Sequence, residues 1–141
     1  MATAHTRSQA RERAVQFLYG VESTGYDWEE SLESFWEAFP SKSGIQTYAE
    51  TLVRGVAAHV ALLDRHIDGA LENWAPDRVG KTERNVLRVA LYEMAYGDVP
   101  SKVAINEAIE IAKNLGADES PRFVNGLLDR LKDAQVREST A

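Results

Sequence analysis

Three arginines near the N-terminus have the clearest chemical potential in this chain: Arg7, Arg11 and Arg13. A guanidinium offers a planar fork of hydrogen-bond donors that fits the oxygens of a phosphate group. Residues 1–13 carry three arginines against one glutamate, in a chain whose net charge is −6. This balance argues against a protein that coats nucleic acid through bulk positive charge. Three phosphate contacts to a single strand would give a salt slope of roughly two, which is typical of weak binding.

Residue patterns typical of catalysis or metal binding are missing from the sequence. The chain has no cysteine, which excludes disulfides, thiolate metal sites and cysteine nucleophiles. It also has no glycine-rich phosphate loop and no His-Glu-x-x-His zinc pattern. The spacing of His59 and His66 favours ordinary helix histidines over metal ligands, and Glu107 and Glu110 are interpreted as a solvated helix face. The sequence therefore favours a binding module without cofactor over an enzyme.

A strongly acidic segment follows the basic one. Residues 22–39 hold six acidic side chains and no lysine or arginine. A solvated negative face is the favoured interpretation, and a basic partner is the alternative. Phe35, Trp36 and Phe39 lie at helical spacing within this segment, which favours core packing over a platform for base stacking.

The length of 141 residues and the hydrophobic content of 44% suit one domain over residues 1–141. We expect flexible tails at residues 1–6 and 135–141. The longest uncharged apolar stretch, residues 55–63, is far shorter than the roughly 20 residues that span a bilayer. The N-terminus has no apolar signal-peptide core. These features predict a cytoplasmic protein with no membrane contact.

Hydrophobic periodicity predicts an all-α fold of six or seven helices. The expected helices cover residues 7–21, 28–39, 45–74, 83–97, 102–115 and 120–132. The third is long for a globular helix, and we expect it to break at Gly55 or within residues 64–66. The fourth is apolar around most of its circumference, which predicts that it lies at the centre of the fold.

Helix boundaries are predicted from a few small residues. Thr82, Ser101 and Ser120 are the expected N-caps, and Gly116 is expected to end a helix in the left-handed conformation. Gly126 lies inside the last expected helix, where glycine costs about 1 kcal/mol relative to alanine. We therefore expect a neighbouring segment to approach closely at Gly126.

The first helix has an apolar stripe formed by Ala10, Ala14, Phe17, Leu18 and Val21. The two arginines at positions 7 and 11 continue this stripe toward the N-terminus. We interpret the change from apolar residues to arginine as the place where the helix passes the edge of the core. Both guanidiniums should then be exposed, and replacing both arginines by alanine should leave folding intact.

Four stretches form a recognisable series: ARERAVQFLY at residues 10–19, RNVLRVALYE at 84–93, DVPSKVAINEAIEIAK at 98–113 and SPRFVNG at 120–126. In this order and spacing they resemble the NusB family of bacterial transcription antitermination factors. The resemblance covers nearly the whole chain. It implies an all-α fold of seven helices in two halves and no enzymatic activity. It also implies binding to the boxA element of ribosomal RNA leader transcripts together with NusE, a small-subunit ribosomal protein, and assembly with NusA, NusG and RNA polymerase.

The resemblance assigns roles to individual residues of this chain. It places five residues at the RNA: Arg7, Arg11, Arg13, Glu119 and Phe123. It places four residues at NusE: Tyr19, Asp77, Glu83 and Arg88. The helical phase of Phe123 also suits the core. Ser8 and Gln9 stand where many relatives carry arginine, which lowers the expected affinity for RNA.

Two alternatives stay open on the sequence alone. The same helical fold occurs as the N-terminal domain of certain ribosomal RNA cytosine methyltransferases, and the chain would then be a fragment of such an enzyme. The other alternative is a protein-interaction module or homodimer, in which the arginines are ordinary surface charge. RNA binding measured with and without NusE distinguishes the alternatives.

Overall fold

The structure is a computed structural model of the chain, and it describes residues 3–24, 28–71, 75–97 and 99–133, except the side chains of residues 22–24. Its helices are α1 (Ala4–Thr24), α2 (Trp28–Ala38), α3 (Ser43–Ala70), the short 3-10 helix η1 (Pro76–Arg78), α4 (Lys81–Tyr96), α5 (Ser101–Leu115) and α6 (Ser120–Leu131). The described residues contain no strand, which confirms the predicted all-α class. Residues 4–6, expected in a tail, belong to α1. The expected tail at 135–141 and the expected helix end at residue 74 lie outside the described residues.

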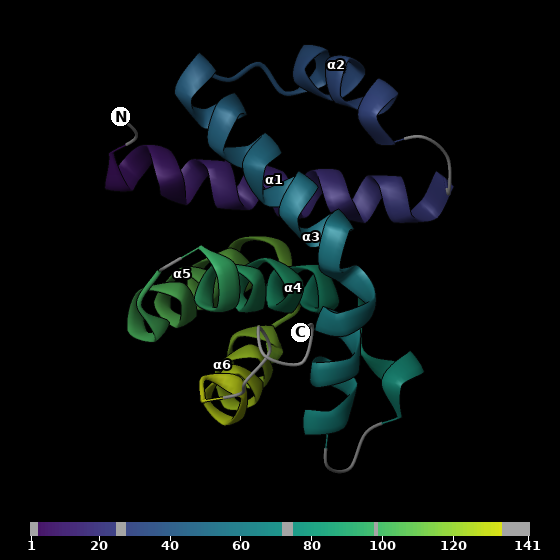
Figure 1. Ribbon diagram of the computed structural model, residues 1–141, viewed down its shortest axis with the longest axis vertical. Coiled ribbons are helices and arrows are strands. Elements are labelled where there is room, and N and C mark those ends of the chain that lie inside the picture. The colour runs from purple at the N-terminus through teal and green to yellow at the C-terminus, as the bar shows by residue number, and fades with distance from the viewer. Residues whose placement is uncertain (1–2, 25–27, 72–74, 98, 134–141) are drawn as a thin grey trace.

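The helices form two groups that share α3 (Figure 1). The first part of α3 lies with α1 and α2, and its later part runs beside the group of α4, α5 and α6. The helix α4 packs against four others, namely α1, α3, α5 and α6. Its position at the centre confirms the prediction made from its apolar circumference.

One continuous hydrophobic core contains side chains from all six α-helices. The predicted stripe of α1 is confirmed, because Ala10, Ala14, Phe17 and Leu18 are buried and Val21 packs against them. The apolar sides of α5 and α6 also point inward, with Ala108 and Ile111 of α5 and Val124 and Leu127 of α6 in the core. Phe35 and Trp36 pack against this core as expected, whereas Phe39 is 36% exposed and lies at its edge.

The helix α3 is bent at His59, where the backbone has φ −122° and ψ 15°. The predicted break at Gly55 or residues 64–66 is therefore wrong. Gly55 stays helical and serves packing, because a Cβ added there would overlap the ring of Tyr92 in α4. The His59 ring stacks on Tyr96, with 4.1 Å between the ring centroids and 12° between the planes.

The predicted caps are wrong in detail. Thr82 is inside α4, and Ser101 and Ser120 are the first residues of their helices. The three residues that precede these helices make no capping hydrogen bond through their side chains. Gly116 does end α5, but with extended backbone at φ −98° and ψ −171°. An added Cβ at Gly126 would meet nothing within 4 Å, so the expected close approach is absent.

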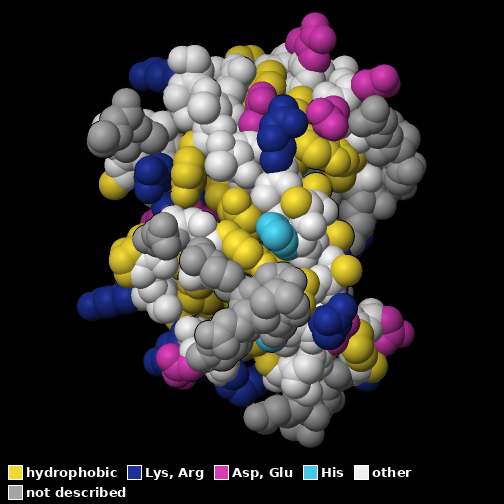
Figure 2. Space-filling model, in the orientation of Figure 1, with side chains coloured by type: hydrophobic (Ala, Val, Ile, Leu, Met, Phe, Trp, Pro, Cys, Tyr) yellow, Lys and Arg dark blue, Asp and Glu magenta, His cyan; other side chains and the backbone are white. Residues whose placement is uncertain are grey.

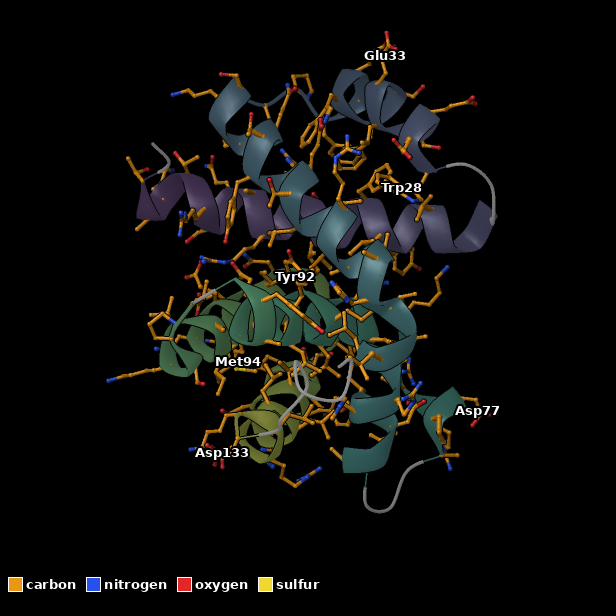
Figure 3. The ribbon with its side chains drawn as sticks, in the orientation of Figure 1. Trp28, Glu33, Asp77, Tyr92, Met94 and Asp133 are labelled. Atoms are coloured by element: carbon orange, nitrogen blue, oxygen red, sulfur yellow. The ribbon has the colours of Figure 1, made fainter. Side chains whose placement is uncertain are left out.

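The surface over α2 is acidic, as the sequence predicts (Figure 2). Glu29, Glu30, Glu33 and Glu37 are all exposed, and Glu33 points away from the molecule (Figure 3). No described helix is long and apolar enough to cross a membrane. Across the same described residues, no three histidine or acidic side chains are grouped so that they could hold a metal ion.

Candidate nucleic-acid interface

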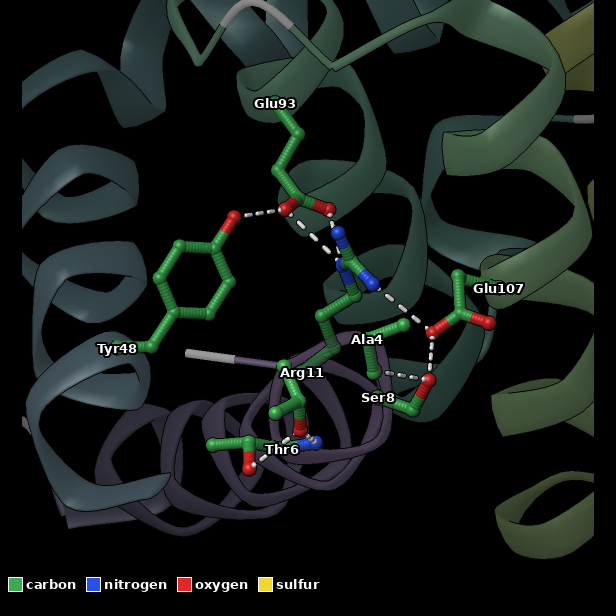
Figure 4. A network of polar contacts seen from close by, with 8 residues as sticks. Ala4, Thr6, Ser8, Arg11, Tyr48, Glu93 and Glu107 are labelled. Atoms are coloured by element: carbon green, nitrogen blue, oxygen red, sulfur yellow. Dashed lines mark hydrogen bonds and ion pairs between the residues drawn. The ribbon is translucent and has the colours of Figure 1, made fainter. Parts of the chain in front are cut away.

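Arg11 lies inside the protein where α1, α3, α4 and α5 meet (Figure 4). Its Nε donates to both carboxylate oxygens of Glu93, at 2.8 and 3.0 Å, and its Nη1 donates to Oε1 of Glu107 at 2.9 Å. Arg11 is only 5% exposed, so the expectation that its guanidinium is free on the surface is wrong. The stripe changes from apolar residues to arginine because α4 and α5 supply carboxylates at this point, where a buried charge requires pairing.

Tyr48 completes this buried network from α3. Its hydroxyl donates to Glu93, and its ring centroid lies 5.8 Å from Cζ of Arg11. Burial raises the pKa of Tyr48, and the hydrogen bond and charge of Glu93 raise it further, to about 12. Burial lowers the pKa of Arg11, but the hydrogen bond and charge of Glu93 outweigh burial, so this pKa is raised. Both side chains therefore stay protonated at neutral pH.

Glu107 is half-buried and also accepts a hydrogen bond from the hydroxyl of Ser8. The interpretation of Glu107 as solvated surface is therefore wrong. The same interpretation is correct for Glu110, because this side chain is exposed and pairs with Lys113 at 3.1 Å. An acidic residue on a helix that is predicted to be central indicates a buried ion pair, and Glu93 is such a residue.

Arg7 and Arg13 are the two arginines of α1 whose charge is not neutralised. The guanidinium of Arg7 lies over Tyr48, with 4.8 Å from Cζ to the ring centroid. The guanidinium of Arg13 lies over Phe39 at 5.0 Å, and its Nη1 donates to Gln16 at 2.9 Å. Neither arginine forms an ion pair with any described residue. Aromatic contacts hold the two cations in place without cancelling their charge.

A second surface lies where η1 and the start of α4 meet the connection between α5 and α6. It contains a hollow of about 300 Å³ lined by Arg78, Glu83, Glu119 and Phe123, among others. Glu83 accepts a hydrogen bond from the hydroxyl of Ser120, which joins the two sides. The structure thus brings Glu83, predicted at NusE, together with Glu119 and Phe123, predicted at the RNA. Phe123 is half-buried and both packs against the core and lines the hollow.

The remaining residues predicted at a partner surface differ in exposure. Tyr19 is 46% exposed, and Nζ of Lys81 lies 4.5 Å from its ring centroid. Asp77 is exposed on η1 (Figure 3). Arg88, in contrast, is 9% exposed and donates to the two oxygens of Asp64 at 2.8 and 2.7 Å. Arg88 is therefore turned into the protein, where it joins α4 to α3.

Comparison with known proteins identifies the fold that carries these two surfaces. The model of the NusB family matches residues 8–133 of the chain. The chain belongs to the NusB family. The resemblance deduced from the four sequence stretches is thereby confirmed.

Relatives and solved structures agree with this membership. The transcription antitermination protein NusB of Anaeromyxobacter sp. (strain Fw109-5) is 48% identical over 126 residues, covering 89% of this chain and 88% of the relative. The structure of T. maritima NusB has a TM-score of 0.81 at 33% identity and covers 99% of this chain and 97% of that one. A structure of the antitermination factors NusB and NusE in complex with dsRNA has a TM-score of 0.83 at 27% identity, covering 94% of this chain and 99% of that one.

In this NusB-family chain the first helix connects the two surfaces. Arg7 and Arg13 lie in the first half of α1, and Tyr19 lies in its second half. The surface around Arg7 and Arg13 offers cations for phosphate groups. The surface beyond Tyr19 offers acidic side chains around a hollow. Such an arrangement suits simultaneous contact with a nucleic acid and a basic protein.

Proposed function

We propose that this protein is a transcription antitermination factor that binds boxA-type RNA of ribosomal RNA leader transcripts as a heterodimer with NusE. The observation that carries this proposal is the match of the NusB family to residues 8–133. In this function the heterodimer joins RNA polymerase together with NusA and NusG in the bacterial cytoplasm. The protein catalyses no reaction and needs no cofactor.

Arg7 and Arg13 make the phosphate contacts in this proposal. Both carry positive charge that no described carboxylate neutralises. Arg11 makes no phosphate contact in this proposal, because its guanidinium is occupied by Glu93 and Glu107. Two phosphate contacts to a single strand contribute a salt slope of about 1.4. This contribution is small, which explains why a partner has to add RNA-binding surface.

NusE binds the surface formed by Tyr19, Asp77 and Glu83. Tyr19 and Asp77 are exposed, and Glu83 lines the hollow beside Glu119 and Phe123. The carboxylates of Asp77 and Glu83 and the net charge of −6 favour a basic partner such as a ribosomal protein. Glu119 and Phe123 line the same hollow, which supports an RNA path beside the NusE surface in this proposal.

The test is fluorescence anisotropy with a labelled boxA-type RNA at several salt concentrations, with and without NusE. We expect weak binding by the protein alone and much tighter binding by the heterodimer. In the heterodimer, Arg7→Ala with Arg13→Ala should lower the salt slope by about 1.4, because two phosphate contacts are lost.

Arg54→Ala is the matched control, because Arg54 is exposed on α3 and already faces Glu29 and Glu50. We expect this variant to keep the slope of the unaltered protein. A heterodimer that binds no RNA would contradict the proposal and favour a protein-interaction module. A double variant that behaves like Arg54→Ala would remove the two arginines from the RNA contact.

A further inference from the structure

A polar groove of about 600 Å³ runs along the first half of α1. The helix α1 contributes Gln9 and Arg13, the connection between α2 and α3 contributes Ser41 and Lys42, and the end of α5 contributes Asn114. This volume is in the range of sites that enclose a small ligand. The groove is therefore larger than a simple contact for one phosphate group requires.

The charges in the groove favour an anion. Arg13 and Lys42 line it, and neither forms an ion pair with any residue that the structure describes. The one carboxylate in the lining belongs to Glu12, whose Oε1 accepts a hydrogen bond from Nδ2 of Asn114 at 2.9 Å. Two cations thus face one carboxylate that is already hydrogen-bonded, and the balance is positive.

The uncharged groups of the groove match the edges of nucleobases. Gln9 and Asn114 carry amide groups, each of which combines donors with an acceptor. Gln9 is exposed, and its side-chain partner is His5 of the same helix at 3.2 Å. Amide side chains pair with base edges because both present a donor beside an acceptor. The exposed amides can therefore exchange these local bonds for bonds to a base.

The groove also has a planar cation beside an aromatic ring. The guanidinium of Arg13 lies over the ring of Phe39, and such planar groups stack on unpaired bases. Phosphate, base edge and base plane each find a suitable group within one continuous surface.

We propose that this groove holds one nucleotide of the bound single-stranded RNA and reads its base. Lys42 and Arg13 bind the phosphate of this nucleotide, and Gln9 and Asn114 bind the edge of its base. The inference rests on the proposed function and adds the place where this chain distinguishes one RNA sequence from another. Gln9, Asn114 and Lys42 are then specificity and affinity determinants on the RNA side of the heterodimer.

The role of Lys42 is tested by the salt dependence of RNA binding. In the heterodimer with NusE and a labelled boxA-type RNA, Lys42→Ala should lower the salt slope by about 0.7, the value of one phosphate contact. The loss of affinity should be the same for every RNA sequence, because a phosphate contact carries no base information. Lys102→Ala is the control, since Lys102 is exposed on α5 and outside the groove lining.

The roles of Gln9 and Asn114 are tested with boxA-type RNAs that each lack the base of one nucleotide. At the nucleotide held in the groove, removal of the base should weaken binding to the unaltered heterodimer by about tenfold. The same removal should have little effect on Gln9→Ala or Asn114→Ala, because the base has already lost its partner. Asn106→Ala, which alters an exposed amide of α5 outside the groove, should behave like the unaltered protein.

Two results would overturn the inference. In the first, every missing base has the same effect on the unaltered protein and on the Gln9 and Asn114 variants, so no base is read in the groove. In the second, Lys42→Ala has the same salt slope of RNA binding as Lys102→Ala, so Lys42 contacts no phosphate. The same conclusion holds if Lys42→Ala changes self-association of the protein and leaves RNA binding unchanged. If Arg7→Ala alone, which alters a residue outside the groove lining, still lowers the slope in the same assay, the proposed RNA-binding function survives and only the groove is rejected.

Discussion

Arg11 in the group of helices around α1 and Arg88 in the group around α4 are both enclosed arginines that bind carboxylates, but they differ in what surrounds them. Arg11 is 5% exposed, and its main partner Glu93 is 1% exposed. Arg88 is 9% exposed, but the side chain of its partner Asp64 is 28% exposed. Arg11 joins four helices, whereas Arg88 joins α3 to α4.

This difference in exposure determines how much stability is lost when the arginine of each ion pair is removed. Removal of Arg11 would leave the carboxylate of Glu93 inside the protein without a cation. Removal of Arg88 would leave Asp64 in contact with water and with Arg84, whose Nη1 lies 3.5 Å from its Oδ1. A buried charge without a partner costs much more free energy than a charge that water can reach. The stability of the molecule should therefore depend more on Arg11 than on Arg88.

The largest expected effect is that of Arg11→Ala. It should lower the free energy of unfolding by roughly 3–5 kcal/mol, because Glu93 loses its cation inside the core. Urea denaturation followed by circular dichroism measures this change. Arg13→Ala, on the same helix but without an ion pair to a described residue, is the control and should change stability little. A loss below about 1 kcal/mol for Arg11→Ala would show that the pair is not essential.

Arg88→Ala should have a smaller effect, a loss of about 1–3 kcal/mol, because Asp64 keeps water and Arg84 as partners. The same denaturation experiment measures it. Arg54→Ala sets the level of a surface ion pair, since Arg54 and Glu29 are both more than half exposed in their side chains, and should cost under about 1 kcal/mol. The comparison fails if Arg88→Ala destabilises the protein more than Arg11→Ala.

The smallest expected effect is the pH dependence of the Arg11 network through Tyr48. Its pKa is raised from 10.0 to about 12 in the folded protein, so the stability that the protonated hydroxyl contributes is complete below pH 10. This stability is lost as the pH rises from 10 through about 12. The difference in unfolding free energy between the unaltered protein and Tyr48→Phe should shrink over this interval, as measured by denaturation at several pH values. Tyr19→Phe is the control, because it removes an exposed hydroxyl. If its unfolding free energy changed with pH in the same way as that of Tyr48→Phe, the pH dependence would not come from Tyr48.

Much of the fold follows from hydrophobic periodicity. The stripe on α1 and the central place of α4 depend on which residues are apolar, and the sequence contains that information directly. The position of the bend in α3 does not follow from periodicity. Gly55 suggests a break in the sequence, but it is needed because the ring of Tyr92, on another helix, leaves no room for a Cβ. A glycine that makes room for a neighbour and a glycine that ends a helix have the same appearance in a sequence.

The candidate site shows the same division. Arg7, which the sequence predicts to be exposed, is half-buried, and Arg13 is half-buried as well. The burial of Arg11 depends on Glu93 and Glu107, which become its neighbours only when α4 and α5 pack against α1. The meeting of Glu83 with Phe123 in one hollow is likewise a result of packing between distant segments. Helical phase gives the face of a residue but not the helix that will cover it.

The distance along the chain between the partners of Arg11 has a consequence for biosynthesis. Arg11 and Glu107 are 96 residues apart, and at about 5–20 residues per second roughly 5 to 20 s pass between their addition to the growing chain. During that interval the emerging N-terminal segment has no carboxylate from α4 or α5 to enclose its guanidinium. Enclosure of the Arg11 guanidinium by both carboxylates is therefore completed only after α5 has left the ribosome.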